Sequence, residues 1–247
     1  MTESAKIPFG SFFVIFMLMN DENQLKISKS IFLIPVAYIL AIWFIYWIEI
    51  QFSFNFNKFG VYPRTFKGFR GVFLTHFIHS NTSHLFNNSI PLFVLLTSLF
   101  YFYKDLAYKI LLIGGFFTGL ITWIIARDSY HIGASGIVYL LFSFIFFSGI
   151  IRKHYRLVAL SLIIIFLYGS MIWYVFPIKD GMSWEGHLSG FLVGFVFAIL
   201  FRKKGIVKEE HHFTETEFDL LFDEHGNFSP PEINEDPPEN TIEKNID

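Results

Sequence analysis

The chain has 247 residues, of which 53% are hydrophobic and only 16% charged, with 34 phenylalanines and no cysteine. A soluble domain carries about 25% charged residues, so this composition excludes an ordinary soluble domain, and it equally excludes a disordered chain, thiol catalysis and thiolate metal sites. The net charge of −2 hides an asymmetry, because residues 208–247 carry 13 acidic and 2 basic residues, whereas residues 1–207 carry 8 acidic and 17 basic residues.

Six apolar runs approach the length of about 20 residues that is needed to cross the hydrocarbon layer of a bilayer. In chain order they are residues 31–48, 84–103, 106–126, 132–151, 157–178 and 186–201. Because backbone N–H and C=O groups cannot stay unpaired in lipid, each run is expected to be helical. The sequence therefore predicts an all-α polytopic membrane protein, with a bundle of six transmembrane helices over residues 31–203.

Two segments flank the predicted bundle. Residues 1–30 include an apolar stretch at 12–19 that is too short to span a bilayer and is expected to lie at the cytoplasmic interface. Residues 204–247 form an acidic tail that is expected to be cytoplasmic and mostly disordered. In this tail Phe218, Leu221 and Phe222 have helical spacing, so they either form a short docking motif for an unknown partner or belong to a plain solvated tail.

The distribution of Lys and Arg predicts the orientation. With the N-terminus inside, twelve basic residues fall on cytoplasmic segments and six on outer segments, and positive charges concentrate on the cytoplasmic side of membrane proteins. We therefore expect a multi-pass protein of the cell membrane, such as a bacterial inner membrane, with both termini cytoplasmic. Four of the six outer charges lie in the long aromatic loop 51–82, part of which is expected to lie in the headgroup layer.

Polar groups are costly inside a bilayer and are therefore candidates for function. Three clusters qualify: His84 with Asn88, the run Gly-Ala-Ser-Gly at 133–136, and His187. The second, fourth and sixth spans run in the same direction, from outside to inside, and each cluster lies near the start of one of them. All three clusters are therefore expected at a similar depth near the outer leaflet.

Ser135 and His187 form a candidate catalytic pair. Ser135 is flanked by glycines and opens a helix, whose first N–H groups lack intrahelical partners and can stabilise an oxyanion. A neutral imidazole is the usual base for a serine nucleophile. Glycines at 186, 190 and 194 share one helix face, which lets the sixth span approach the fourth closely. Taken alone, the serine also fits a helix-packing patch, and the histidine also fits a helix cap.

Three further residues extend this hypothesis. His84 and Asn88 are four residues apart, share one helix face and can both donate hydrogen bonds, which suits an oxyanion site. Tyr139, four residues after Ser135, either packs under His187 and orients it or is an ordinary core residue. No Asp or Glu lies within the six runs, so a Ser–His dyad is expected rather than a triad.

Other chemistries fit the sequence less well. The His-Glu-x-x-His pattern of zinc proteases is absent, and no two spans offer facing aspartates. His76, His79 and His84 are spaced by three and five residues, which does not align three metal ligands on one helix. We expect no metal and no cofactor, and no motif for binding phosphate or nucleic acid is present.

The three clusters together resemble the rhomboid family of intramembrane serine proteases. The motifs are His-x-x-x-Asn in the second span, Gly-x-Ser-Gly opening the fourth, and Gly-His followed by small residues in the sixth, within about residues 31–201. The resemblance implies the family's six-helix bacterial core. The family's Trp-Arg pair in the first outer loop is not clear here, and Phe69-Arg70 and Pro63-Arg64 are the nearest candidates.

The resemblance also implies a role for each site residue. Ser135 would be the nucleophile, and His187 the general base, with Tyr139 stacked on it. His84, Asn88 and the backbone N–H of Ser135 would hold the oxyanion, and Gly133 would shape the active-site turn.

The implied activity is hydrolysis of peptide bonds in transmembrane proteins near the outer leaflet. Its partners would be transmembrane substrates and the lipid bilayer. Two alternatives are a catalytically inactive relative that binds transmembrane helices and a small transporter. A transporter predicts ionisable residues along a path through the bilayer midplane, whereas the polar groups here gather at one face.

Overall fold

This computed structural model describes residues 30–168, 173–178, 181–204, 218, 221–223 and 225–229. The chain divides into two compact units, Met1–Lys208 and Glu209–Asp247. The apolar stretch 12–19 lies outside the described residues, as does most of the acidic tail.

Apolar helices dominate the described part of the first unit and coincide with the six predicted spans. They are α2 (Ser30–Gln51), α5 (Thr82–Phe102), α6 (Lys104–Ile125), α7 (Ser135–Ile151), α8 (Tyr155–Tyr168) and α9 (Trp184–Leu200). Three of them, α2, α5 and α6, are long and apolar enough to cross a membrane, and α7 and α9 are shorter apolar helices. The predicted all-α membrane bundle is therefore confirmed.

Two helix bounds differ from the predicted spans. The fourth helix begins at Ser135 rather than at residue 132, because Gly133 adopts a φ of +118°, which is incompatible with a right-handed helix. The fifth helix ends at Tyr168, and Trp173–Val175 form a 3-10 helix, η3, where the apolar run predicted one continuous span to residue 178.

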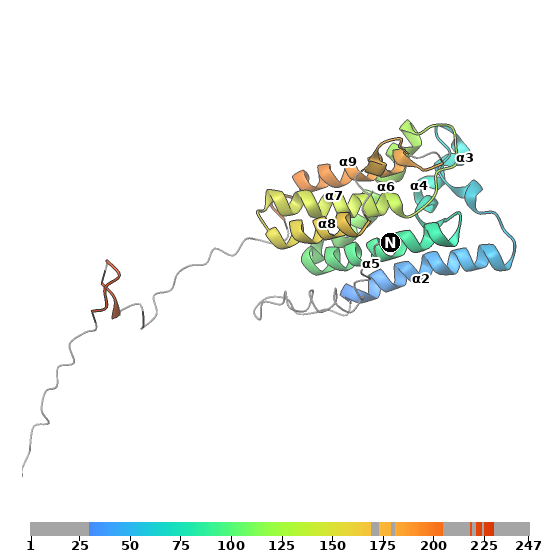
Figure 1. Ribbon diagram of the computed structural model, residues 1–247. Coiled ribbons are helices and arrows are strands. Elements are labelled where there is room, and N and C mark those ends of the chain that lie inside the picture. Colours follow the sequence, from blue (N-terminus) through green and yellow to red (C-terminus); the bar gives the residue numbers. More distant parts are fainter. Residues whose placement is uncertain are drawn as a thin grey trace, which may run out of the picture. The chain divides into compact units, whose positions relative to one another are not determined.

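Helix α7 lies at the centre of the bundle. It packs against α9 on one side and contacts α5, α6 and α8 on others, while α2 packs at the edge against α5 (Figure 1). Most of α7 is buried, whereas α2 exposes large apolar side chains such as Leu33 and Leu40. An exposed apolar face on an edge helix is what lipid contact requires, because large apolar patches are rare on water-facing surfaces.

Two glycines set the distance between α7 and α9. A Cβ atom at Gly190 would lie 2.1 Å from the carbonyl oxygen of Gly136, and one at Gly194 would lie 2.3 Å from that of Leu140. No residue with a side chain fits at either position, so the glycines allow the two backbones to approach closely. The hydroxyl of Ser143 adds an interhelical hydrogen bond by donating to the carbonyl oxygen of Phe191 at 2.7 Å.

The loop between α2 and α5 is built from short helices. They are η1 (Asn57–Phe59), α3 (Phe66–Phe69), α4 (Gly71–Leu74) and η2 (Thr75–Phe77). Helix α4 packs so closely on α6 that a Cβ atom at Gly119 would lie 2.4 Å from the carbonyl oxygen of Val72. The Phe66 side chain is 95% exposed, as an anchor in the headgroup layer would be, and the location of this loop in the membrane stays a prediction.

Arg152 closes the opposite end of the bundle. Its guanidinium donates to the carbonyl oxygen of Phe201 at 2.6 Å and also bonds the Ser148 hydroxyl and the carbonyl oxygen of Lys204. The Tyr103 hydroxyl donates to the same Ser148 hydroxyl at 2.9 Å. These contacts tie the end of α7 to the segment that follows α9.

The described residues 221–223 and 225–229 of the second unit include a tight turn, and the choice between a docking motif and a solvated tail at Phe218, Leu221 and Phe222 stays open. Phe222 pairs with Phe228 in a β-bridge, and the carboxylate of Asp223 accepts hydrogen bonds from the backbone N–H groups of residues 225 and 227. Gly226 has a φ of +79°. Aspartate and glycine favour such turns over helix, because the aspartate bonds the backbone locally and glycine accepts a positive φ.

Candidate functional site

The structure brings Ser135 and His187 into direct contact. Ser135 is the first residue of α7, His187 lies in the first turn of α9, and the distance between Ser135 Oγ and His187 Nε2 is 2.9 Å. The two residues are 52 positions apart in the chain and meet because Gly190 allows α9 to lie against the backbone of Gly136. His187 is 6% exposed, so the pair is largely shielded from solvent.

The hydrogen bonds of His187 define its tautomer. Its Nδ1 atom lies 2.8 Å from the carbonyl oxygen of Tyr174, which can only accept a hydrogen bond. The proton of the neutral ring is therefore on Nδ1, and Nε2 presents a lone pair to the Ser135 hydroxyl. This is the tautomer that a general base for serine requires. A backbone carbonyl occupies the position at which a carboxylate stands in a catalytic triad.

Tyr139 stacks on the imidazole of His187. The ring centroids are 4.4 Å apart with an interplanar angle of 14°, and Tyr139 is buried. Since Tyr139 lies one turn after Ser135 on α7, the same helix carries the hydroxyl and the ring that holds the imidazole in place. Of the two roles that the sequence left open for Tyr139, packing against His187 is the one that this contact fits.

His84 and Asn88 lie beside the turn that leads to Ser135. A Cβ atom at Gly133 would stand 2.7 Å from His84 Nε2 and 3.6 Å from Asn88 Nδ2, so only glycine leaves room for these groups. The φ of +118° at Gly133 independently requires glycine. Asn88 Nδ2 is buried and makes no hydrogen bond within the described residues. A buried donor without a partner is costly unless it serves a ligand, which makes this amide a candidate anion-binding group.

His79 also belongs to the site, although the sequence indicated it only as one of three doubtful metal ligands. Its Nε2 atom accepts a hydrogen bond from the backbone N–H of Ala134 at 3.3 Å. Burial, with a smaller effect of neighbouring His84, lowers the pKa of His79 to about 3, so the ring is neutral and able to accept. His76, His79 and His84 bond Gly115, Ala134 and Ser80 separately, and they do not converge as metal ligands.

A small polar cavity lies directly beside Ser135. Its polar lining includes His76, Thr118, Thr122 and His131. His76 Nε2 lies 3.0 Å from the carbonyl oxygen of Gly115, whereas His76 Nδ1 and Thr118 Oγ1 are buried and have no partner among the described residues. Two orphaned polar atoms in a polar cavity are what a bound water molecule needs.

A buried charged network connects the segments that carry the dyad. The carboxylate of Glu185 in α9 accepts hydrogen bonds from the Arg127 guanidinium at 3.0 Å and from the Arg127 backbone N–H at 3.2 Å. His131 Nε2 lies 3.0 Å from the carbonyl oxygen of Arg127, and its Nδ1 lies 2.7 Å from the Ser183 hydroxyl. Burial lowers the pKa of His131, so its ring is neutral. Glu185 and His131 are not among the residues that the sequence motifs indicate.

One of the two Arg candidates for anchoring the first outer loop reaches the loop between α6 and α7. Arg64 donates to the carbonyl oxygens of Ile124 and Ala126 and pairs with Asp128. Arg70 instead stays within its own loop, where it bonds the carbonyl oxygen of Lys58. Of the two arginine candidates, Arg64 is therefore the one that links the two outer loops.

Comparison with known proteins identifies the family of this chain. The Rhomboid domain matches residues 67–204, which is more than half of the chain. Uncharacterized proteins of Mycobacterium bovis and Mycobacterium tuberculosis are each 35% identical over 156 residues, covering 57% of this chain and 62% of the relative. An uncharacterized protein of Mycobacterium leprae is 30% identical over 158 residues, or 56% of this chain and 60% of the relative. The chain thus aligns with about three fifths of the length of these curated relatives. The chain belongs to the rhomboid family.

Proposed function

We propose that this protein is an intramembrane serine endopeptidase that cleaves transmembrane proteins, with Ser135 as nucleophile and His187 as general base. The observation that carries the proposal is the 2.9 Å contact between Ser135 Oγ and the unprotonated Nε2 of His187. The rhomboid family consists in general of serine intramembrane proteases, which supports the same reaction class.

In the first step, Ser135 Oγ attacks the carbonyl carbon of the scissile peptide bond while its proton passes to His187 Nε2. The imidazolium that forms carries a proton on each nitrogen. Its Nδ1 proton remains bonded to the Tyr174 carbonyl oxygen, and the face of the Tyr139 ring stabilises the new positive charge. The imidazolium of His187 is thus held in the same orientation as the neutral ring.

The negative charge that develops on the carbonyl oxygen requires donors that are in place beforehand. The Asn88 amide is such a donor, because Nδ2 is buried and unpartnered within the described residues. His84 Nε2 lies on the same side of Gly133. The backbone N–H of Ser135, at the first position of α7, completes the oxyanion site.

Collapse of the tetrahedral intermediate breaks the C–N bond, and His187 gives its proton to the leaving amine. A water molecule from the cavity beside Ser135 then attacks the acyl-enzyme, again with His187 as base, and releases the carboxylic acid product. The orphaned atoms of His76 and Thr118 are suited to hold that water close to the ester.

The substrate segment has to be extended at the site, because a helix hides its carbonyl groups in hydrogen bonds. Substrates should therefore carry helix-weakening residues near the cleaved bond. The Lys and Arg distribution favours an orientation with both termini cytoplasmic, which puts the Ser135 end of the bundle near the outer leaflet of a cell membrane, such as a bacterial inner membrane.

The test is cleavage of a transmembrane peptide with a helix-weakening segment by the purified full-length protein in detergent. Cleavage should be lost in both Ser135→Ala and His187→Ala and should persist with a metal chelator. Full activity of Ser135→Ala, or loss of activity with the chelator, would exclude the proposed mechanism. A protein that binds the peptide but never cleaves it would be the inactive helix-binding relative instead.

A further inference from the structure

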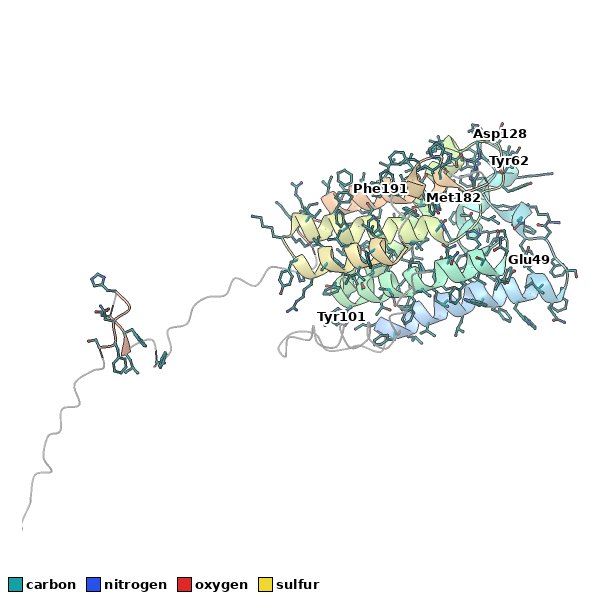
Figure 2. All side chains as sticks on the ribbon, viewed as in Figure 1. Glu49, Tyr62, Tyr101, Asp128, Met182 and Phe191 are labelled. Carbon is teal, nitrogen blue, oxygen red and sulfur yellow. The ribbon has the colours of Figure 1, made fainter. Side chains whose placement is uncertain are left out.

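The loop that presents Ser135 and the helix turn that presents His187 are joined by a second, buried set of contacts. The loop runs from Ala126 to Ala134 between α6 and α7, and the turn opens α9 at Trp184. Figure 2 shows Asp128 of this loop and Met182, just before α9, at the same end of the bundle, away from Tyr101. Ser135 directly follows this loop, and His187 lies in the first turn of α9.

Glu185 is the group at which these contacts converge. It is 1% exposed and lies two residues before His187. Arg127 Nη1 donates to both carboxylate oxygens of Glu185, at 3.0 Å each. The backbone N–H of Arg127 donates a further hydrogen bond to the same carboxylate. The second guanidinium nitrogen of Arg127 donates to the carbonyl oxygen of Met182 at 2.7 Å. One side chain therefore contacts both Glu185 in α9 and the segment just before α9.

His131 makes the second connection. Its Nε2 donates to the Arg127 carbonyl oxygen, and its Nδ1 accepts from the hydroxyl of Ser183, which forms no side-chain cap on α9. The backbone of His131 also pairs with Val61 in a β-bridge, and its carbonyl oxygen accepts from the Thr75 hydroxyl at 2.7 Å. The loop is therefore held on one side by the first outer loop and on the other by α9.

We propose that Glu185, through Arg127 and His131, is a positioning residue that fixes the separation of Ser135 and His187. This inference rests on the proposed protease function. A buried carboxylate is tolerated only when it is paired, and here the pair spans the two segments of the dyad without touching Ser135 or His187. The network acts by setting this distance, and a misplacement of about 1 Å between reacting groups is enough to slow catalysis roughly a hundredfold.

The test compares Glu185→Gln, which keeps the shape but places an N–H₂ group against a guanidinium donor, with Asp128→Asn. Asp128 is the matched control, since it lies in the same loop as Arg127 but its side chain is 72% exposed and pairs with Arg64. Glu185→Gln should lower kcat and the rate of fluorophosphonate labelling of Ser135 at least tenfold with KM unchanged. Asp128→Asn should leave both rates within twofold of the parent.

Two further variants separate positioning from stability. Arg152→Ala destabilises the opposite end of the bundle, and at equal loss of Tm it should not slow labelling. Arg127→Lys tests the same network if Glu185→Gln does not fold, because the 44% exposed Arg127 side chain tolerates replacement. Lysine has only one nitrogen and lacks the second one, which in Arg127 bonds the carbonyl oxygen of Met182. Arg127→Lys should also slow labelling about tenfold, and combined with Glu185→Gln it should add nothing further.

Labelling within twofold of the parent in both Glu185→Gln and Arg127→Lys would overturn the inference, as would slowing in Arg152→Ala equal to that in Glu185→Gln. These results leave the proposed function intact as long as Ser135→Ala abolishes cleavage. Cleavage by Ser135→Ala would instead refute the proposed function.

Discussion

Replacing Gly190 by alanine should separate the two halves of the site without altering either reactive side chain. The new Cβ atom would stand 2.1 Å from the carbonyl oxygen of Gly136, one residue after Ser135. Carbon and oxygen atoms in contact lie no closer than about 3 Å, so α9 has to move away from α7 by roughly 1 Å. That oxygen is a backbone atom and cannot rotate aside.

A displacement of about 1 Å is large compared with the change in the Ser135–His187 distance that catalysis tolerates. An added 1 Å would stretch the 2.9 Å contact between Ser135 and His187 past the limit of a hydrogen bond. The expected loss is about 10²-fold in kcat/KM, or roughly 2.7 kcal/mol of transition-state stabilisation. Overpacking costs about 1–3 kcal/mol of stability, and the higher helix propensity of alanine offsets about 0.5–1 kcal/mol, so the protein should still fold.

The assay is cleavage of a transmembrane peptide together with thermal unfolding in detergent. Gly115→Ala is the matched control, because its new Cβ would meet only the end of the Ile137 side chain at 3.0 Å and His76 Nε2 at 3.9 Å. It should keep activity near that of the parent. Undiminished kcat/KM in Gly190→Ala would refute the argument that close packing of α7 and α9 holds the dyad together.

Three further variants test other parts of the site. Asn88→Ala removes the amide that has no partner among the described residues, and it should lower kcat about 10²–10³-fold in a peptide-cleavage assay. Asn87→Ala, on the exposed face, should not lower kcat, and equal effects of the two variants would contradict the oxyanion role. Tyr139→Phe keeps the stacked ring and should retain most of the rate at which a fluorophosphonate labels Ser135. Tyr139→Leu should lower this labelling rate about tenfold, and identical rates in the two variants would exclude the orienting role of the ring. Ser143→Ala loses its hydrogen bond to α9 and should lower the free energy of unfolding by about 0.6–2 kcal/mol, with activity retained; an unchanged Tm would show that this bond does not stabilise the bundle.

The contact between Ser135 and His187 was predictable because it follows from rules that act along the chain. Apolar runs fix the number and direction of the spans, and polar residues at the start of every second span must then lie at the same end. The glycines at 190 and 194 indicated which two spans approach most closely, and the structure has α9 on α7 at these positions. Parity and small residues were thus enough to bring Ser135 to His187.

What the sequence did not reveal depends on contacts between loops. The proton on His187 Nδ1 is held by the backbone carbonyl of Tyr174, and any residue type at that position offers a carbonyl. Glu185 lies only two residues from His187 in the chain, but its partners Arg127 and His131 lie across the fold, so the chain alone does not indicate them. The fifth helix ends at Tyr168, well before the apolar run does, so hydropathy did not indicate its end.

The most direct measurement of the central claim is the site and rate of covalent labelling by a fluorophosphonate probe, mapped by mass spectrometry on the full-length protein in detergent. If His187 activates Ser135, the probe will modify Ser135 alone, and His187→Ala will lose the modification while remaining folded. Modification at another residue, or equally fast labelling of Ser135 in His187→Ala, would contradict the account.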